Sequence, residues 1–264
     1  MTFKNKTVWI IGASFGIGKA LSVNFAKLEA NLVISSRKIN ELEKVKTECL
    51  KYTESCSIIP LDLEKNDNYK HKVDEVIQKY KNIDYLIVNG GVSQRSLAYE
   101  TPIAIDRRLM EINYFGNISI TKAVLPHMIE QQSGHIITVS SISGKFGFPL
   151  RSAYSAAKHA LHGFYETLRF EHKKDNILVT IVIPGRIKTQ VSINAIKKDG
   201  KQHGEMDPGQ EKGMPAEECS RQIIKAIRKN KKEILIGGKE LMMVRFRRCL
   251  PFLFYKMVGK VEAK

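Results

Sequence analysis

The sequence lacks the cysteine pairs that indicate a disulfide framework or a zinc site. Its four cysteines, Cys49, Cys56, Cys219 and Cys249, form no CxxC pair and have no metal-ligand spacing with histidine. Reduced thiols in a cytosolic protein account for such a distribution. We therefore expect no disulfide and no bound metal.

Long apolar runs and linkers are also missing. No stretch approaches the roughly 20 residues that a membrane-spanning helix needs, and the strand-like run Thr7–Ile11 comes too early for a signal peptide to precede it. There is no internal repeat, low-complexity linker or break in composition. With 264 residues, of which 43% are hydrophobic and 27% charged, the chain is long enough to bury its own core. We expect one cytoplasmic domain spanning residues 1–264.

Acidic residues are few relative to basic ones. Lys and Arg total 43 against 27 for Asp and Glu, which gives a formal net charge of +16. Such an excess can indicate nucleic acid, anionic lipid or phosphorylated ligands. The lysines, however, are scattered over expected helix surfaces, with no interleaved aromatic platform and no recognisable nucleic-acid module. A solvated basic surface explains them better, and we expect no nucleic-acid partner.

Strand-like and helix-like segments alternate along the chain. Apolar runs, several of them rich in Val and Ile on both faces, predict strands at Thr7–Ile11, Asn31–Ser35, Ser57–Leu61, Tyr85–Val88, His135–Val139, Leu178–Ile183 and Glu233–Ile236. Amphipathic segments predict helices between them, for example at Gly18–Leu28, Ile39–Lys51, Tyr69–Lys81 and Ala216–Lys229. This alternation is typical of a doubly wound α/β domain of the Rossmann type, with a central parallel sheet of about seven strands flanked by helices.

Two segments depart from this alternation. Residues 186–214 are rich in Lys, Gly, Gln and Asp, follow a strand directly and predict a long mobile loop that could serve as a substrate lid. Residues 239–264 mix apolar clusters with arginines. That tail could lie in the plane of an anionic membrane. Alternatively, its apolar part packs over the substrate cleft or at a subunit contact while the arginines remain solvated.

A glycine-rich turn joins the first strand to the first helix. Glycines permit positive φ and close approach of the backbone to a pyrophosphate, and a helix N-terminus supplies free N–H groups and positive potential. The strand–turn–helix context makes the pattern informative. The predicted nucleotide-binding residues of this turn are Gly12, Ser14, Phe15, Gly16, Ile17 and Gly18.

The end of the second strand predicts which nicotinamide cofactor is used. An NAD site usually carries an acidic residue there, which accepts hydrogen bonds from the adenosine ribose. This chain has Ser35-Ser36-Arg37 instead. Arg37 can pair with a 2′-phosphate, and Ser14 or Ser36 can add a hydrogen bond. The alternative is that Arg37 merely begins the next helix, but the residues favour NADP(H).

Three residues farther along the chain have the chemistry of a carbonyl-reduction site. Tyr154 and Lys158 are four apart at the start of a helical run, so their side chains share one face. A free tyrosine has a pKa of about 10, and a neighbouring ammonium together with the nicotinamide ring favours the phenolate and lowers that pKa. Ser141 ends a strand, thirteen positions before Tyr154, and can donate to the substrate oxygen.

Together, the glycine turn, Ser141 and the Tyr154–Lys158 pair resemble the short-chain dehydrogenase/reductase family over nearly the whole chain. The turn fits the family's TGxxxGxG pattern except that Ile11 replaces the threonine, and Val88-Asn89-Gly90-Gly91 fits its NNAG motif without the first asparagine. The segments 113–116, 150–154 and 191–195 resemble the branch of dehydrogenase/reductase members 7 and 7B. That branch is associated with lipid-like carbonyl substrates and membrane attachment.

The resemblance implies further site residues and a mode of assembly. Asn113 would complete the catalytic set by holding a proton-relay water. Homodimers or homotetramers, built on the long helices that include Asn113 and Tyr154, are implied as well. The additional cofactor contacts implied are Asp62 and Leu63 at the adenine, Asn89 and Gly90 after the fourth strand, and Pro184, Gly185, Ile187 and Thr189 beside the nicotinamide and phosphates.

Several of these residues have plainer explanations. Ser140 precedes Ser141 and could be mistaken for it, although the thirteen-residue spacing favours Ser141, and Asn113 could simply cap or kink its helix. Three histidines near the site in sequence fit packing or surface roles, because no metal or triad pattern joins them: His135, His159 and His162.

The prediction that results is an NADP(H)-dependent oxidoreductase. It transfers a hydride reversibly between the nicotinamide and a carbonyl or alcohol substrate, with Tyr154 as general acid/base, and the substrate is expected to be lipophilic. A non-enzymatic NADP-binding sensor or scaffold is the competing hypothesis. The intact Ser141, Tyr154 and Lys158 argue against it.

Overall fold

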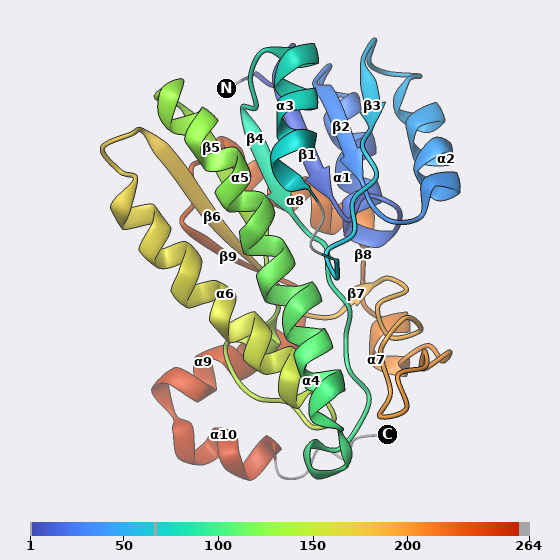
Figure 1. The fold of residues 1–264 in the computed structure, drawn as a ribbon. Coiled ribbons are helices and arrows are strands. Elements are labelled where there is room, and N and C mark those ends of the chain that lie inside the picture. Colours follow the sequence, from blue (N-terminus) through green and yellow to red (C-terminus); the bar gives the residue numbers. More distant parts are fainter. Residues whose placement is uncertain (1, 66–67, 259–264) are drawn as a thin grey trace.

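A seven-stranded parallel sheet forms the centre of the chain (Figure 1), in a computed structural model that describes residues 2–65 and 68–258. Its strands follow the order β3-β2-β1-β4-β5-β6-β9. The order reverses between β1 and β4, which is where ligands bind in sheets of this kind. The strands are β1 (Thr7–Ile11), β2 (Asn31–Ser35), β3 (Cys56–Ile58), β4 (Tyr85–Val88), β5 (Gly134–Val139), β6 (Ile177–Pro184) and β9 (Glu233–Ile236).

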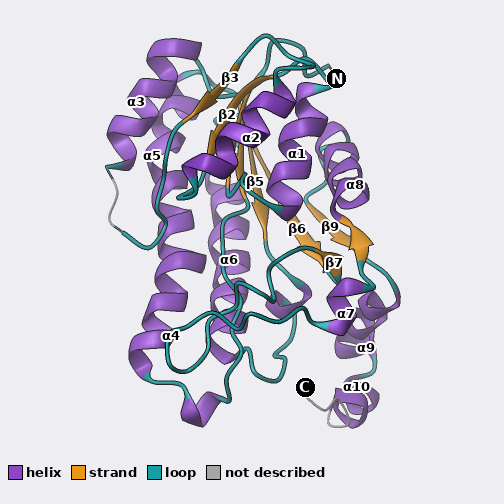
Figure 2. Cartoon of the chain, turned by 90° about the vertical axis from the view of Figure 1, so that its right-hand side faces the viewer, coloured by secondary structure: helices purple, strands orange, loops and turns teal. Residues whose placement is uncertain are grey.

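Helices cover both faces of the sheet because the strands are apolar on both sides. All residues of β1, β4 and β5 are buried, as expected for strands between two helical layers. One layer comprises α1 (Gly16–Ala26), α2 (Ile39–Cys49) and α8 (Ala216–Arg228). The other comprises α3 (Tyr69–Tyr80), α4 (Ile103–Met110), α5 (Gly116–Glu130) and α6 (Ser152–Glu171), and Figure 2 shows the two layers on opposite sides of the strands.

The predicted fold class is confirmed: β1, β2, β4 and β9 have the predicted bounds, and the other elements predicted by range, apart from the third strand, agree within two residues at each end. The third strand shows the largest shift, since it spans Cys56–Ile58 rather than Ser57–Leu61. Pro60 lacks the N–H that a longer ladder needs. The first helix starts at Gly16, two residues before the predicted Gly18. The turn and the helix therefore overlap, which brings the N–H groups of the helix N-terminus into the glycine motif itself.

The 186–214 segment has little regular structure of its own. It contains β7 (Ile187–Lys188) and α7 (Pro208–Glu211), and β7 pairs with β8 (Met214–Pro215). The segment is nevertheless anchored to the rest of the chain. Arg95 N–H donates to the Ile196 carbonyl at 2.9 Å, and Ile196 N–H donates to the Ser93 carbonyl at 2.9 Å. These bonds place the segment over the carboxyl ends of the strands.

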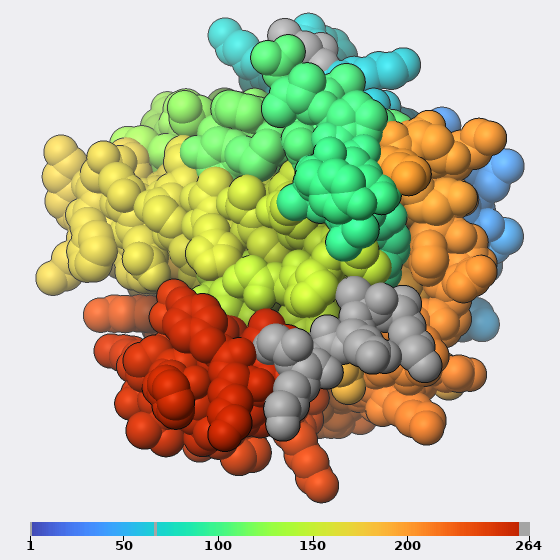
Figure 3. All heavy atoms as spheres, turned by 90° about the horizontal axis from the view of Figure 1, so that it is seen from below, coloured from blue at the N-terminus to red at the C-terminus, as the bar shows by residue number. Residues whose placement is uncertain are grey.

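The C-terminal tail folds into two short helices, α9 (Met242–Cys249) and α10 (Pro251–Val258). Residues 259–264 of the predicted tail lie outside the described residues. Figure 3 shows these helices as a red cluster beside the yellow residues of α6. Across residues 2–65 and 68–258, no helix combines the length and the apolarity that crossing a membrane requires.

Candidate active site

The glycine turn packs against the end of β4. Gly12 and Gly16 have φ angles of 80° and 55°, which glycine adopts at no steric cost. A Cβ on Gly12 would lie 2.8 Å from the Gly90 Cα. Asn89 Nδ2 donates to the Gly12 carbonyl at 3.1 Å. The NNAG-like segment therefore holds the turn in place, even though Val88 replaces its first asparagine.

A cavity of about 920 Å³ opens beside this turn at the carboxyl ends of the strands. That volume falls within the range of small-molecule and cofactor sites. All but two of the predicted site residues line it: Gly12, Ser14, Phe15, Gly16, Ile17, Arg37, Asp62, Leu63, Asn89, Gly90, Ser141, Tyr154, Lys158, Pro184, Gly185, Ile187 and Thr189.

The two exceptions, Gly18 and Asn113, support the walls of the cavity. A Cβ on Gly18 would collide with the Gly12 carbonyl, so Gly18 permits α1 to pack under the turn. Asn113 is fully buried in a π-helical turn, Glu111–Phe115, a feature frequent at functional sites. Its Nδ2 donates to the carbonyls of Leu109 and Val92 at 2.9 Å, and Val92 N–H donates back to its Oδ1 at 3.1 Å.

Ser141, Tyr154 and Lys158 meet in the cavity from two elements. Ser141 follows β5, and its Oγ accepts a hydrogen bond from Ser143 N–H at 3.1 Å. Tyr154 and Lys158 extend from successive turns near the start of α6. The Lys158 Nζ lies 5.7 Å from the centroid of the Tyr154 ring and donates to the Val139 carbonyl at 2.9 Å. This bond fixes the ammonium at the carboxyl end of β5.

Burial dominates the acid–base properties of both residues. Burial raises the pKa of Tyr154, whereas its hydrogen bond with Ser141 and the positive charges of Arg151 and Arg95 lower that pKa. Burial also lowers the pKa of Lys158 to about 8. The charges that favour the Tyr154 phenolate therefore include those of two arginines, Arg151 and Arg95, for which sequence analysis had named only Lys158.

Ser140 has a separate, structural role. It is buried and borders the cavity, but its hydroxyl points toward α6, where it donates to the Lys158 carbonyl at 3.2 Å and lies 3.0 Å from His162 Nε2. His135 Nε2 lies 2.8 Å from Thr180 Oγ1, and His159 Nδ1 lies 2.8 Å from the Ser155 carbonyl. Within the described chain, none of these three histidines lines the cavity.

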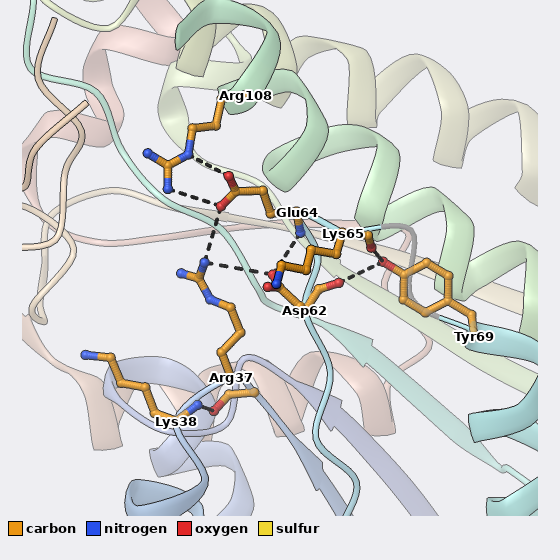
Figure 4. A network of polar contacts seen from close by, with 8 residues as sticks. Arg37, Lys38, Asp62, Glu64, Lys65, Tyr69 and Arg108 are labelled. Atoms are coloured by element: carbon orange, nitrogen blue, oxygen red, sulfur yellow. Dashed lines mark hydrogen bonds and ion pairs between the residues drawn. The ribbon is translucent and has the colours of Figure 1, made fainter. Parts of the chain in front are cut away.

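Arg37 lies in a network of charges where the cavity borders the end of β2 (Figure 4). Its Nη1 is 3.4 Å from Glu64 Oε2 and 3.8 Å from Asp62 Oδ1. Arg108, from α4, holds Glu64 with two hydrogen bonds of 2.8 and 3.1 Å. The ammonium of Lys38 lies over the Phe15 ring, 4.8 Å from its centroid. Arg37 thus faces the cavity rather than simply beginning α2.

The structure also brings together charged residues that sequence analysis missed. Arg95 and Arg151 share one carboxylate oxygen of Asp207, at 2.8 and 3.1 Å, beside Tyr154. The only local signal was the position of Arg151 directly before the helix that carries Tyr154. Nothing in the sequence pattern connects Asp207 or Arg95 with that helix.

A nicotinamide cofactor fits this arrangement. The side-chain-free positions Gly12, Gly16 and Gly90 form a cradle, and α1 starts at it without a side-chain cap in the described structure. Its first N–H groups are therefore available to a phosphate. The cavity continues from this cradle to Tyr154 and Lys158, so a ligand bound to the turn can extend to both.

Comparison with known proteins agrees with the geometry. The short chain dehydrogenase family model matches residues 6–200. A dehydrogenase/reductase SDR family protein 7-like from Anopheles gambiae is 40% identical over 237 residues, covering 88% of this chain and 75% of the relative. Dehydrogenase/reductase SDR family member 7B from Mus musculus is 36% identical over 266 residues, covering 99% and 82%.

Solved structures show the same fold. A short-chain dehydrogenase/reductase from Burkholderia phymatum, crystallised in complex with NAD, superposes with a TM-score of 0.84 at 18% identity and covers 100% of this chain and 99% of its own. At that identity, the similarity bears on the fold alone. The family match and the relatives together show that the chain belongs to the short-chain dehydrogenase/reductase family, in the branch of members 7 and 7B, and is an oxidoreductase that uses a nicotinamide cofactor.

Proposed function

We propose that the protein is an NADP(H)-dependent carbonyl reductase, which also catalyses the reverse oxidation of the alcohol. The observation that carries this proposal is that Ser141, Tyr154 and Lys158 line the same cavity as the glycine turn. A proton donor, an oxygen-binding hydroxyl and a cofactor cradle are thereby within reach of one bound substrate.

Each of the three residues has one task in the reaction. When bound, the reduced nicotinamide supplies the hydride that attacks the carbonyl carbon. Ser141 donates a hydrogen bond to the carbonyl oxygen and stabilises the negative charge that develops there. Tyr154 gives its phenolic proton to that oxygen. Lys158 would hold the cofactor ribose with its ammonium, and its positive charge favours the phenolate that remains. Asn113 keeps the Val92 backbone in place beside this group and, in this proposal, positions a relay water.

Preference for NADP(H) over NAD(H) is part of the proposal. Arg37 follows β2 at the position where NAD-binding sites carry a carboxylate. Arg37 and Lys38 both line the cavity, and a guanidinium can bind a 2′-phosphate through two parallel hydrogen bonds. In the structure, the guanidinium of Arg37 pairs with the carboxylates of Asp62 and Glu64. A 2′-phosphate would draw Arg37 away from these carboxylates.

The substrate end of the cavity supports a partly apolar substrate. Its walls include Phe146, Phe148, Leu150 and Met243, the last of which belongs to α9. Apolar burial contributes about 25 cal/mol per Å², so this wall favours a lipophilic carbonyl or alcohol. Met243 in this wall supports the interpretation in which the apolar part of the tail packs over the substrate cleft.

Consumption of NADPH and NADH against a panel of aldehydes, ketones and lipid-derived carbonyls tests the proposed function. We expect turnover with at least one lipophilic carbonyl and a higher kcat/KM with NADPH. Tight NADPH binding without any turnover across the panel would contradict the enzymatic proposal and favour a cofactor-binding sensor or scaffold instead. Higher kcat/KM with NADH would contradict the cofactor assignment only.

We also propose that this cytoplasmic enzyme touches anionic membranes through its C-terminal helices. Phe254 is anchored against Phe146, with ring centroids 5.1 Å apart, but Phe252 and Tyr255 are 84% and 59% exposed. Arg247 lies beside the ring of Tyr255. Exposed aromatic residues next to arginines favour the interface of an anionic bilayer.

Changing Phe252 and Tyr255 to serine is expected to remove most co-sedimentation with phosphatidylserine-containing vesicles, because it removes the exposed aromatic side chains proposed to enter the bilayer interface. The anchored Phe254 and the cavity wall stay intact. Tyr52→Ser is the matched control, since Tyr52 is also an exposed aromatic residue but follows α2, far from the C-terminal helices in the chain. Sedimentation that is equal in all variants would show that the tail is not the membrane contact.

For assembly, we propose a homodimer or homotetramer that uses the outer faces of α5 and α6. Apolar side chains remain exposed along this part of the surface, among them Phe115 at 46% and Phe170 at 74%. Subunit contact would bury them.

A further inference from the structure

A cluster of three charges lies at the substrate end of the cavity and outside the catalytic set. Asp207 Oδ2 accepts a hydrogen bond from Arg95 Nη2 at 2.8 Å and another from Arg151 Nη2 at 3.1 Å. The Arg95 side chain is only 5% exposed, and that of Arg151 is 16% exposed. Two buried guanidinium groups therefore share one carboxylate, and the cluster carries a net charge of +1.

The two arginines belong to the rigid part of the fold. Arg95 Nη1 donates to the Gln94 carbonyl at 2.8 Å and to Ser93 Oγ at 3.1 Å. The Gln94 side chain accepts hydrogen bonds from the N–H groups of Ala153 and Tyr154, at 2.9 and 3.3 Å. The loop that holds Arg95 is thus tied to the first turn of α6, and Arg151 lies directly before that turn, three residues ahead of Tyr154.

Asp207, in contrast, belongs to the 186–214 segment. Its N–H donates to Ser192 Oγ at 3.1 Å, within the same segment, and its carboxylate is the charged contact between that segment and the arginines. Docking of Asp207 delivers one negative charge to the cluster, whereas Arg186, at the start of the same segment, is positively charged and donates its N–H to Glu240 Oε1 at 2.8 Å. Undocking of Asp207 would withdraw its negative charge and leave two like charges close together in a partly buried site, where Coulomb interactions are strong.

We propose that Arg95, Asp207 and Arg151 form a charge latch, through which docking of the 186–214 segment controls the electric field at the catalytic Tyr154. This inference rests on the proposed function of Tyr154 as proton donor. Neither arginine nor Asp207 is part of the family's Ser–Tyr–Lys set as it matches this chain. They are positioning residues that act through Tyr154, not residues that exchange protons with the substrate.

The latch has a definite chemical consequence. With Asp207 docked, the net positive charge near the phenol is smaller, so the phenol holds its proton more firmly, which suits a donor in carbonyl reduction. With Asp207 withdrawn, both guanidinium groups favour the phenolate, which is the form that accepts a proton in alcohol oxidation. The charged groups that face this site are Lys158 on α6, Arg95 after β4, Arg151 before α6, Asp207 before α7, Arg186 after β6, and Lys239 and Glu240 ahead of α9.

Direct titration of Tyr154 tests the latch without any turnover. Protein labelled with ¹³C at the tyrosine ring is titrated by NMR, and the spectrum of Tyr154→Phe identifies the resonance. Asp207→Asn is expected to lower the pKa of Tyr154 by about one pH unit, and Arg151→Met is expected to raise it by a similar amount. Arg151→Lys, which keeps the charge, should restore most of the wild-type value.

Glu100→Gln is the matched control for loosening of the segment. Glu100 pairs with Lys198 of the same segment at 2.9 Å, but this exposed pair does not line the cavity. We expect no change in the titration of Tyr154 in this variant. Shifts of equal sign in Asp207→Asn and Arg151→Met, or no shift in either, would overturn the latch. The titration reports the protonation of Tyr154 and needs no turnover. A protein that reduces no carbonyl would therefore contradict the proposed function, and the titration would still show whether the latch acts on Tyr154.

Discussion

Tyr154→Phe is expected to lower kcat for carbonyl reduction by about 10²–10⁴-fold, the usual contribution of a general acid. The substitution removes one oxygen atom and retains the ring, which packs beside Lys158 with the ammonium 5.7 Å from its centroid. NADPH affinity should change by less than about threefold, because Ser141, Lys158 and the glycine turn remain. Steady-state kinetics together with fluorescence titration of NADPH separate the two effects.

Tyr99→Phe is a suitable control for this experiment. Tyr99 is 85% exposed. The Tyr99→Phe variant loses the same hydroxyl as Tyr154→Phe, so its turnover should match that of the wild type.

In the wild-type enzyme, the rate of reduction should also fall as the pH rises through the pKa of Tyr154, because the phenolate has no proton to give. Reduction that survives in Tyr154→Phe at near wild-type rate would exclude Tyr154 as the donor.

Arg37→Ser is expected to reduce kcat/KM with NADPH by about 10–150-fold, which corresponds to the 1.5–3 kcal/mol of a charged hydrogen bond. The value with NADH should change little or rise, since NADH has no 2′-phosphate. The ratio of the two kcat/KM values is the quantity to measure. Glu64 and Asp62 would then face the adenosine ribose without the compensating guanidinium, which would further disfavour the phosphate.

Arg221→Ser removes the same charge at a distant position and controls for the overall basic character of the chain. Arg221 lies on α8, exposed and paired with Glu218. Its substitution should leave the ratio of kcat/KM with NADPH to kcat/KM with NADH unchanged. Equal losses with both cofactors in Arg37→Ser would indicate a structural role for Arg37 and would count against recognition of the 2′-phosphate.

The elements of the fold could be predicted from sequence because each is specified locally. The Val- and Ile-rich runs that form β1, β2 and β4 are continuous in the chain, and their burial on both faces follows from composition alone. Tyr154 and Lys158 could be paired for the same reason, since four positions on a helix bring two side chains to one face. The glycine turn was recognisable because positive φ demands glycine at Gly12 and Gly16.

Contacts between distant residues could not be predicted in this way. Arg95 and Asp207 are 112 positions apart, and Arg108 and Glu64 are 44 apart. No periodicity joins such pairs, because what brings them together is the packing of α4 and the 186–214 segment over the strand ends. The π-helical turn at Asn113 is likewise a matter of packing, although the resemblance to the family had singled out Asn113 itself.

The sequence by itself thus determined the fold class and the family, and it predicted a set of site residues of which all but Gly18 and Asn113 line one cavity. Only the tertiary structure decided the electrostatics of the site, in which burial raises the pKa of Tyr154 and two distant arginines oppose that rise. The reason is physical. Local structure depends on neighbours along the chain, whereas the energy of a charge depends on its distance in space to every other charge and on its exposure to water.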